Sequence, residues 1–272
     1  MALKGTRIAF IGSGVMGRAI ISGLLSKGLV EPELIIAADP DMAAMQTVQA
    51  NNGIAVTRDN LEAVAGAQIL VLCVKPQNMG TVLDGLRGHV AHVELAISIA
   101  AGVTLKTIEE GLALTHVVRA MPNTPGQIGE GVSVWTNTPE VTDEQKKQAQ
   151  EILEAMGQAI HVHDEKYLDM ATALTGSGPA YVFMFIEALI DAGVRMGFSR
   201  DIATTLAMQL VKGSTDFLAQ SGAHPTVLRN QVTSPGGTTA AALYELDKGN
   251  FRTTISDAIW AAYQRSIELG KD

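Results

Sequence analysis

The pattern of apolar and polar positions along the chain changes near residue 165. Before it, short apolar runs alternate with helical patterns, which is typical of βαβ units. The run Ile69–Val74 is continuously apolar instead of alternating, which predicts strands covered by helices on both faces of a largely parallel sheet. The expected strands are residues 7–11, 34–38, 68–74, 95–99, 116–121, 132–135 and 158–162.

Beyond residue 167 the strand pattern gives way to long amphipathic stretches. Pro179 at a helix start and Ser199 as an N-cap support this reading. We therefore predict an α/β fold with a doubly wound, Rossmann-type domain over residues 1–164 and an all-helical domain over 165–272. The run Tyr181–Ile186 is apolar on more than one face, which fits a subunit interface or an ordinary core filled by Met and Phe. The expected helices are residues 179–196, 199–220, 238–248 and 253–269.

Composition narrows the class of protein. The 272 residues are 47% hydrophobic and 18% charged, with a formal net charge of −8. This charge, with no basic patch, argues against nucleic acid or an anionic membrane as a partner. The single cysteine, Cys73, lies in an apolar run and reads as a buried residue of a cytoplasmic protein. We expect no membrane span, because no uninterrupted apolar stretch reaches about 18 residues.

A glycine-rich turn near the N-terminus predicts a dinucleotide site. Gly12–Gly17 has the form G-x-G-x-x-G, directly after an expected strand and at the start of an expected helix. Gly12 permits the tight turn, Gly14 the approach of a pyrophosphate, and Gly17 close helix packing. Asp39 ends the next strand, about 20 residues further on, where an acid binds the ribose hydroxyls and favours NADH over NADPH. The alternative for Asp39 is a simple Asp-Pro turn.

Other candidate ligands follow later strands of the expected sheet. Lys75 could bind a substrate carboxylate or a cofactor phosphate, or could be an exposed lysine at a helix start. The small residues 100–102 would let a flat ring lie close to the backbone. Asn123, between two prolines, suits an amide that contacts the nicotinamide or ribose, or merely a tight turn.

A second anion site is expected in the helical half. Ser234–Thr239 reads Ser-Pro-Gly-Gly-Thr-Thr and precedes an alanine-rich helical pattern. Backbone N–H groups at a helix N-terminus attract a carboxylate or phosphate. The alternative is a glycine-rich loop with a threonine N-cap.

Taken together, the motifs resemble those of the Δ1-pyrroline-5-carboxylate reductase family. They occur in the order G-x-G-x-x-G, Val-Lys-Pro, Met-Pro-Asn-Thr-Pro, Gly-Ser-Gly-Pro-Ala-Tyr and Ser-Pro-Gly-Gly-Thr-Thr, across essentially the whole chain. The first motif is shared by many dehydrogenases, whereas the last two are specific to this family. The resemblance implies reduction of the cyclic imine Δ1-pyrroline-5-carboxylate to L-proline with NADPH or NADH. It also implies a homodimer built through a helical substrate-binding and dimerisation domain, often assembled into a decamer of five dimers.

The resemblance also implies site residues. Thr239 lies near the imine nitrogen and, with Lys75, is a candidate catalytic residue. The implied cofactor-binding residues, beside Asn123, are Ile11, Gly12, Ser13, Gly14, Val15, Met16, Asp39, Asn60, Cys73, Val74, Lys75, Pro76, Ile99, Ala100 and Ala101. The implied substrate-binding residues are Ser234, Gly237, Thr238, Thr239, Glu165 and Ser177.

Alternatives remain at this point. Tyr181 could rival Thr239 as a proton donor, although a packing role is the common one. His161 and His163 have ligand-type side chains but alternate along a strand without a third histidine nearby, so no metal is expected. A β-hydroxyacid dehydrogenase of similar layout would need a catalytic lysine on the helical domain, and Lys212 lacks the expected context. A non-catalytic nucleotide sensor would have no need of the Ser234–Thr239 loop.

Overall fold

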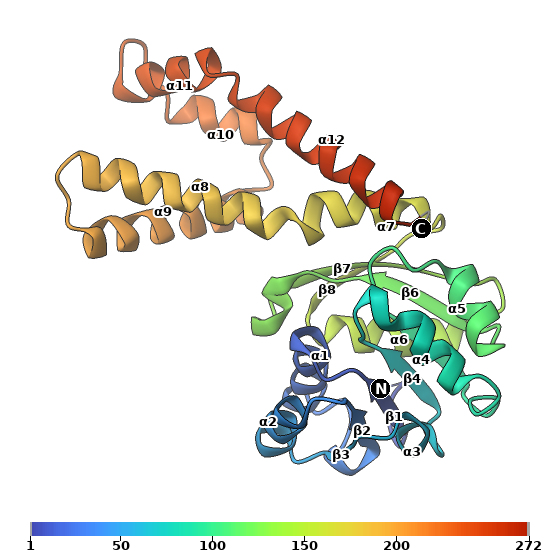
Figure 1. Ribbon diagram of the computed structural model, residues 1–272. Coiled ribbons are helices and arrows are strands. Elements are labelled where there is room, and N and C mark those ends of the chain that lie inside the picture. The colour runs from blue at the N-terminus through green and yellow to red at the C-terminus, as the bar shows by residue number, and fades with distance from the viewer. Residues whose placement is uncertain (1, 271–272) are drawn as a thin grey trace. The chain divides into compact units, whose positions relative to one another are not determined.

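The computed structural model describes residues 2–270, which divide into two compact units (Figure 1). One unit contains the chain up to Ser177 together with the chain from Ala262 onward, and the other is Gly178–Ala261. The sequence predicts a domain boundary between residues 164 and 165, which is earlier in the chain than this division into compact units. That domain boundary stays a prediction.

The first unit is built on one eight-stranded sheet. Its strand order is β3-β2-β1-β4-β5-β6-β7-β8, and every neighbouring pair is parallel except β6 with β7. This confirms the doubly wound α/β prediction. The short β3 was not predicted, because three residues with one exposed carry little apolar pattern. The strands are β1 (Ile8–Ile11), β2 (Ile35–Ala38), β3 (Ala55–Thr57), β4 (Ile69–Leu72), β5 (Leu95–Ser98), β6 (Val117–Met121), β7 (Gly131–Asn137) and β8 (Gly157–His161).

Side chains of β1 alternate between two buried cores. Ile8 and Phe10 belong to a cluster that includes residues of α1 and α6, whereas Ala9 and Ile11 belong to one that includes residues of α4 and α5. Because both faces are covered, every β1 residue is buried, which explains the continuous apolar run. The helices of this layer are α1 (Val15–Ser26), η1 (Pro32–Leu34), α2 (Met42–Asn52), α3 (Asn60–Val64), α4 (Pro76–Leu86), α5 (Leu105–Leu112), η2 (Thr124–Ile128) and α6 (Asp143–Glu154).

The rest of the chain is helical, as predicted. Ser199 caps α9, since its side chain accepts a hydrogen bond from the Ile202 N–H at 3.4 Å. Helices α8 and α9 run side by side in opposite directions (Figure 1). The short α7 and α10 were not predicted. The helices are α7 (Lys166–Ala171), a π-helical turn η3 (Thr172–Gly176), α8 (Gly178–Arg195), α9 (Arg200–Ser221), α10 (Pro225–Gln231), α11 (Thr238–Lys248) and α12 (Phe251–Leu269).

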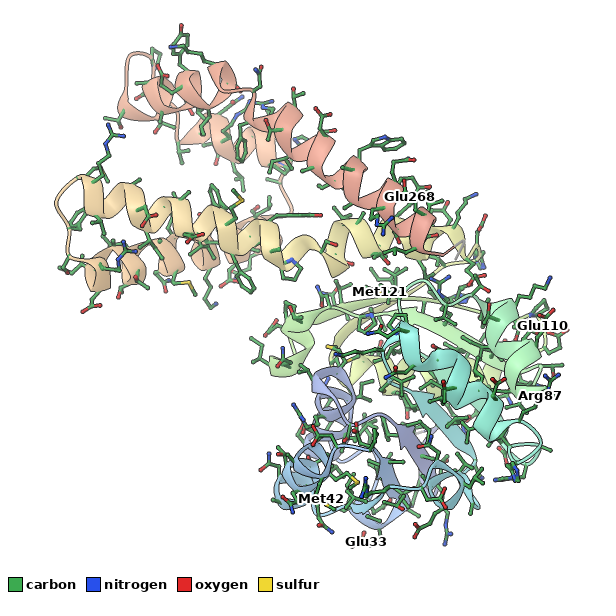
Figure 2. All side chains as sticks on the ribbon, in the orientation of Figure 1. Glu33, Met42, Arg87, Glu110, Met121 and Glu268 are labelled. Carbon is green, nitrogen blue, oxygen red and sulfur yellow. The ribbon has the colours of Figure 1, made fainter. Side chains whose placement is uncertain are left out.

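The second unit exposes a large apolar surface. Within Gly178–Ala261 the buried residues are Gly193, Ala203 and Ala207. Phe183 is 63% exposed and Met184 73% exposed, and side chains project from both sides of α8 and α9 (Figure 2). The alternative of an ordinary intrachain core for these residues is therefore wrong. Exposed apolar surface of this kind marks a protein contact.

Candidate active site

Four predicted ligand segments meet at one edge of the sheet. Gly12, Asp39, Cys73 and Ile99 each directly follow a strand, and these strands are neighbours in the order β2-β1-β4-β5. Backbone hydrogen bonds hold their register: Gly12 N donates to Ala38 O at 2.8 Å, Cys73 N to Ile11 O at 2.8 Å, and Ile99 N to Leu72 O at 3.1 Å. Because the chain leaves β1 first toward β2 and later returns at β4, this is the point where ligands of doubly wound sheets bind.

The glycine turn has the geometry that its sequence predicts. Gly12 has φ +97°, and a Cβ there would lie 2.8 Å from the Cys73 carbonyl oxygen. At Gly17 a Cβ would lie 2.5 Å from the Gly12 oxygen, so only glycine lets α1 pack this closely on the turn. Gly14 differs, because a Cβ there would meet no atom within 4 Å. Its hydrogen thus faces open space beside the N-terminus of α1.

The backbone of Ser13 is held by two side chains. Asp39 Oδ2 accepts the Ser13 N–H at 2.7 Å, and Arg18 Nη1 donates to the Ser13 carbonyl oxygen at 3.2 Å. The Ser13 hydroxyl is fully buried and has no hydrogen-bond partner within the described residues. An unpartnered buried hydroxyl costs about 1–3 kcal/mol, which a ligand oxygen would recover.

These features fit a dinucleotide. The N-terminus of α1 begins at Gly14 without a side-chain cap, so its first N–H groups carry no side-chain acceptor. Together with the Ser13 hydroxyl and the open space at Gly14, they could bind a pyrophosphate. Arg18 was missed in the sequence. A basic residue one helical turn after Gly14 was the available signal.

Asp39 does more than end β2. Its Oδ1 accepts the Asp41 N–H at 2.9 Å, while Oδ2 accepts that of Ser13. The carboxylate therefore fixes both its own turn and the glycine turn. It remains partly exposed, with lone pairs left for a ribose hydroxyl.

The segment after β4 combines a desolvated thiol with an exposed amine. Cys73 is only partly buried as a residue, yet burial of its thiol raises the pKa of Cys73 well above the usual range. Val74 is partly buried, and Lys75 and Pro76 are exposed at the start of α4. Asn60, the first residue of α3, is partly buried.

The segment after β5 is tightly supported. Ser98 is fully buried, and its Oγ accepts the Ala100 N–H at 3.3 Å. Ala100 is buried, and Ile99 and Ala101 are partly buried. Small side chains therefore line this edge, as the sequence predicts for a site that holds a flat ring.

Asn123 and Ser177 have structural bonds of their own. Asn123 Oδ1 accepts the Val132 N–H at 2.9 Å, which ties the turn after β6 to β7. Ser177 N donates to Thr172 O at 2.8 Å and closes the π-helical turn. At Gly176 a Cβ would lie 2.5 Å from Cε of Met121, which ends β6 (Figure 2).

Glu165 pairs with a buried arginine that the sequence analysis missed. Arg119 Nη1 donates to Glu165 Oε1 at 2.7 Å, with the Arg119 side chain 5% exposed and that of Glu165 30% exposed. The same oxygen accepts the Leu105 N–H at 2.8 Å. An arginine inside an apolar strand was the available signal, since a buried charge needs a partner.

In the second unit, Ser234–Thr239 forms a tight turn before α11. Gly236 has φ +70°, and Gly237 N donates to Ser234 O at 3.0 Å. The N-cap of α11 is Gly237, so the alternative of a threonine N-cap is wrong. The N–H groups at the start of α11, from Thr238 and Thr239, therefore have no side-chain cap. This is the arrangement expected of an anion site.

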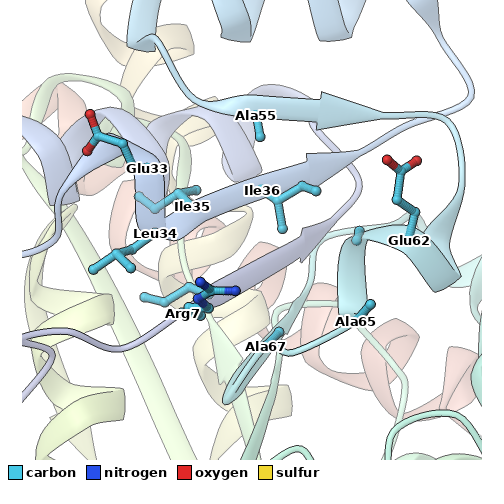
Figure 3. A pocket seen from close by; sticks show the side chains of 11 residues that line it. Arg7, Glu33, Leu34, Ile35, Ile36, Ala55, Glu62, Ala65 and Ala67 are labelled. Atoms are coloured by element: carbon cyan, nitrogen blue, oxygen red, sulfur yellow. The ribbon is translucent and has the colours of Figure 1, made fainter.

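Two other features lie away from these segments. A cavity of about 190 Å³ is lined by Arg7, Glu33, Glu62 and apolar residues at the amino ends of β1, β2 and β3, opposite the glycine turn (Figure 3). Among residues 2–270 no three His, Cys, Asp or Glu side chains are placed to hold a metal ion. His161 Nε2 hydrogen-bonds with Asn137 Oδ1 at 2.8 Å, and its ring packs against that of Trp135 at a tilt of 47°, with the ring centroids 4.3 Å apart.

Comparisons with known proteins support the same layout. Residues 165–269 match the family model "Pyrroline-5-carboxylate reductase dimerisation", and residues 7–102 match "NADP oxidoreductase coenzyme F420-dependent". A pyrroline-5-carboxylate reductase of Synechocystis sp. is 41% identical over 97% of this chain and 98% of its own length.

Two solved structures are similar over almost the whole chain. A pyrroline-5-carboxylate reductase from Coxiella burnetii is 35% identical with a TM-score of 0.91, covering 98% of this chain and 99% of that one. Pyrroline carboxylate reductase of Plasmodium falciparum, solved with NADP bound, is 33% identical with a TM-score of 0.88 and covers 98% of both.

Proposed function

The chain belongs to the pyrroline-5-carboxylate reductase family, and we propose that the sheet edge at Gly12 and the Ser234–Thr239 loop supply its cofactor and carboxylate sites. The protein is an NAD(P)H-dependent oxidoreductase that reduces Δ1-pyrroline-5-carboxylate to L-proline, the final step of proline biosynthesis. The observation that carries this conclusion is the match to reductases of this name over nearly their whole length.

The reaction needs orientation more than strong acid chemistry. NAD(P)H supplies a hydride, which forms a C–H bond at the imine carbon while the C=N π electrons move to nitrogen. A proton or hydrogen bond on that nitrogen makes the carbon electrophilic. The protein must hold the reacting carbons about 3–3.5 Å apart, which accounts for much of the rate advantage.

For the cofactor we assign separate roles along the sheet edge. The N–H groups at the start of α1 and the Ser13 hydroxyl bind the pyrophosphate, and Asp39 binds the ribose. Residues 99–101, of which Ala100 and Ala101 are small, receive the nicotinamide ring. The support is the buried, unpartnered Ser13 hydroxyl and the open space at Gly14.

For the substrate we assign the carboxylate to the turn Ser234–Thr239. The uncapped N–H groups of α11 and the hydroxyls of Ser234 and Thr238 would bind it. Thr239 would hydrogen-bond the imine nitrogen and relay a proton to it. Its hydroxyl has a pKa too high for a free acid in water, so we expect the relayed proton to come from solvent and to form the iminium before the hydride arrives.

Lys75, Asn123 and Ser177 keep their proposed site roles, with different degrees of structural support. Lys75 is exposed beside the dinucleotide edge and keeps its proposed role toward a phosphate or carboxylate. Asn123 can still donate through its amide nitrogen, because only its oxygen is used by Val132. Ser177 stays a proposed substrate contact.

We also propose a homodimer formed through α8 to α12, and a decamer of five such dimers as the larger assembly. The dimerisation model covers these helices, and Gly178–Ala261 buries too few residues to be stable alone. The helix Lys166–Arg195 is also long and apolar enough to cross a membrane, with mean hydropathy 1.4 over an 18-residue window. One such helix is weak evidence for a span, and an interface explains its apolar surface. We therefore keep the proposal of a cytoplasmic protein.

Turnover tests the proposal directly. Purified protein should oxidise NADH and NADPH, assayed separately, only when pyrroline-5-carboxylate is present, and no turnover with either would refute the function. Thr239→Val should lower kcat, whereas Thr239→Ser, which keeps the hydroxyl, should retain most of it. Full activity in Thr239→Val would show that the hydroxyl has no part in proton delivery.

A further inference from the structure

The loop between β5 and α5, residues 99–104, is held by elements from far along the chain. Its start is fixed by the sheet, through the bonds of Ile99 N to Leu72 O and of Ala100 N to Ser98 Oγ. Its end is fixed by Glu165 Oε1, which accepts the N–H of Leu105, the first residue of α5. A carboxylate at a helix N-terminus is favourable because of the helix dipole.

The middle of the loop contacts the end of α12. Gly102 has φ +75°, and a Cβ there would lie 3.4 Å from the Leu269 carbonyl oxygen. The end of α12 is in turn tied to α7, because the buried Ser266 Oγ donates to Asp169 Oδ1 at 2.8 Å. The end of α12, itself held by α7, thus lies against the middle of the loop.

Arg119 fixes the position of Glu165 in this arrangement. It lies in β6 beside Ser98 of β5, and only 4% of its surface is exposed. A guanidinium buried this deeply needs its carboxylate partner, so Glu165 is held where it reaches both Arg119 and Leu105. One carboxylate oxygen therefore connects β6, α5 and the start of α7.

We propose that Arg119 and Glu165 are a positioning pair that sets the loop 99–104 for the nicotinamide ring, and that Glu165 acts through this loop and not by binding the substrate. The proposal rests on the proposed function, because it takes residues 99–101 as the surface that receives the ring. It replaces the substrate contact that the family resemblance implied for Glu165.

The test measures nucleotide binding without substrate. The NADH dissociation constant of the full-length protein is measured at 25 °C by fluorescence titration, for the wild type and for Glu165→Gln, Arg119→Met and the double variant. We expect the NADH dissociation constant to rise about tenfold in each single variant. We expect the NADH dissociation constant of the double variant to be no higher than that of the single variant with the weaker binding, because both residues act on the same loop.

A matched control is available next to Glu165. Asp164→Asn removes a neighbouring carboxylate that is paired with Lys166 at 2.8 Å on the surface, and should leave NADH binding unchanged. If Arg119→Met fails to fold, the double variant still carries the test, since it leaves no buried charge without a partner.

Two results would overturn the proposal. Direct substrate binding by Glu165 predicts a raised KM for pyrroline-5-carboxylate in Glu165→Gln with an unchanged NADH dissociation constant. A purely structural role predicts a lower unfolding midpoint with unchanged NADH binding at 25 °C. Failure of the proposed function would appear differently, as an absence of turnover in the wild type. The NADH dissociation constants of the wild type and the variants could still be compared in that case.

Discussion

Gly14→Ala separates binding of the dinucleotide from stability of the fold. Gly14 has φ −64° and ψ −172°, which alanine adopts readily, and the added methyl group would meet no protein atom within 4 Å. Replacing glycine where the backbone is compatible stabilises by roughly 0.4–1 kcal/mol. Alanine is a poorer N-cap than glycine by a similar amount, so the net change in unfolding free energy should be below about 1 kcal/mol.

The cost should instead appear in the complex. The methyl group would occupy the space through which a pyrophosphate approaches the N–H groups at the start of α1. We expect the dissociation constants of NADH and NADPH to rise at least about tenfold, or roughly 1.4 kcal/mol. Calorimetric titration gives the affinity, and a thermal melt gives the stability.

Two further glycines make the comparison decisive. Gly80→Ala, in α4 with open space at its Cβ, should leave nucleotide binding unchanged. Gly17→Ala should destabilise the fold by about 1–3 kcal/mol, because its methyl group would overlap the Gly12 carbonyl oxygen. Wild-type affinity in Gly14→Ala would refute the assignment of this turn to the pyrophosphate.

Three other predictions concern single side chains. Asp39→Ser should raise kcat/KM for NADPH relative to NADH, because a 2′-phosphate would no longer meet a carboxylate; an unchanged ratio would show that Asp39 serves only the turn. Burial, His163 and Lys146 lower the pKa of His161, so its protonation opposes folding and stability should fall as pH drops below 6.5. Urea titrations across this pH range should show that the free energy of unfolding depends less on pH in His161→Gln than in the wild type. Burial raises the pKa of Cys73, so iodoacetamide should modify it at about pH 8 only after unfolding; rapid labelling of the folded protein would contradict this.

The parts of the fold that the sequence predicted are those whose signals are local. Seven strands and the four long helices follow from apolar periodicity, and Ser199 was identified as a cap from its position. The elements missed, β3, α7 and α10, are short, with three, six and seven residues. The antiparallel pairing of β7 with β6 could not be predicted from the sequence, because strand direction depends on how the chain crosses the sheet.

The candidate site divides in the same way. The glycine turn and the Ser234–Thr239 turn could be predicted from the sequence, because backbone sterics at glycine and the free N–H groups of a helix start act within a few residues. The hydrogen bond from the Ser13 N–H to Asp39, 26 residues away, depends on the packed fold. So does the contact of Glu165 with Arg119 and Leu105, 46 and 60 residues away. Buried polar groups take whichever partner the packed sheet and helices bring within hydrogen-bonding distance, and no local pattern records that partner.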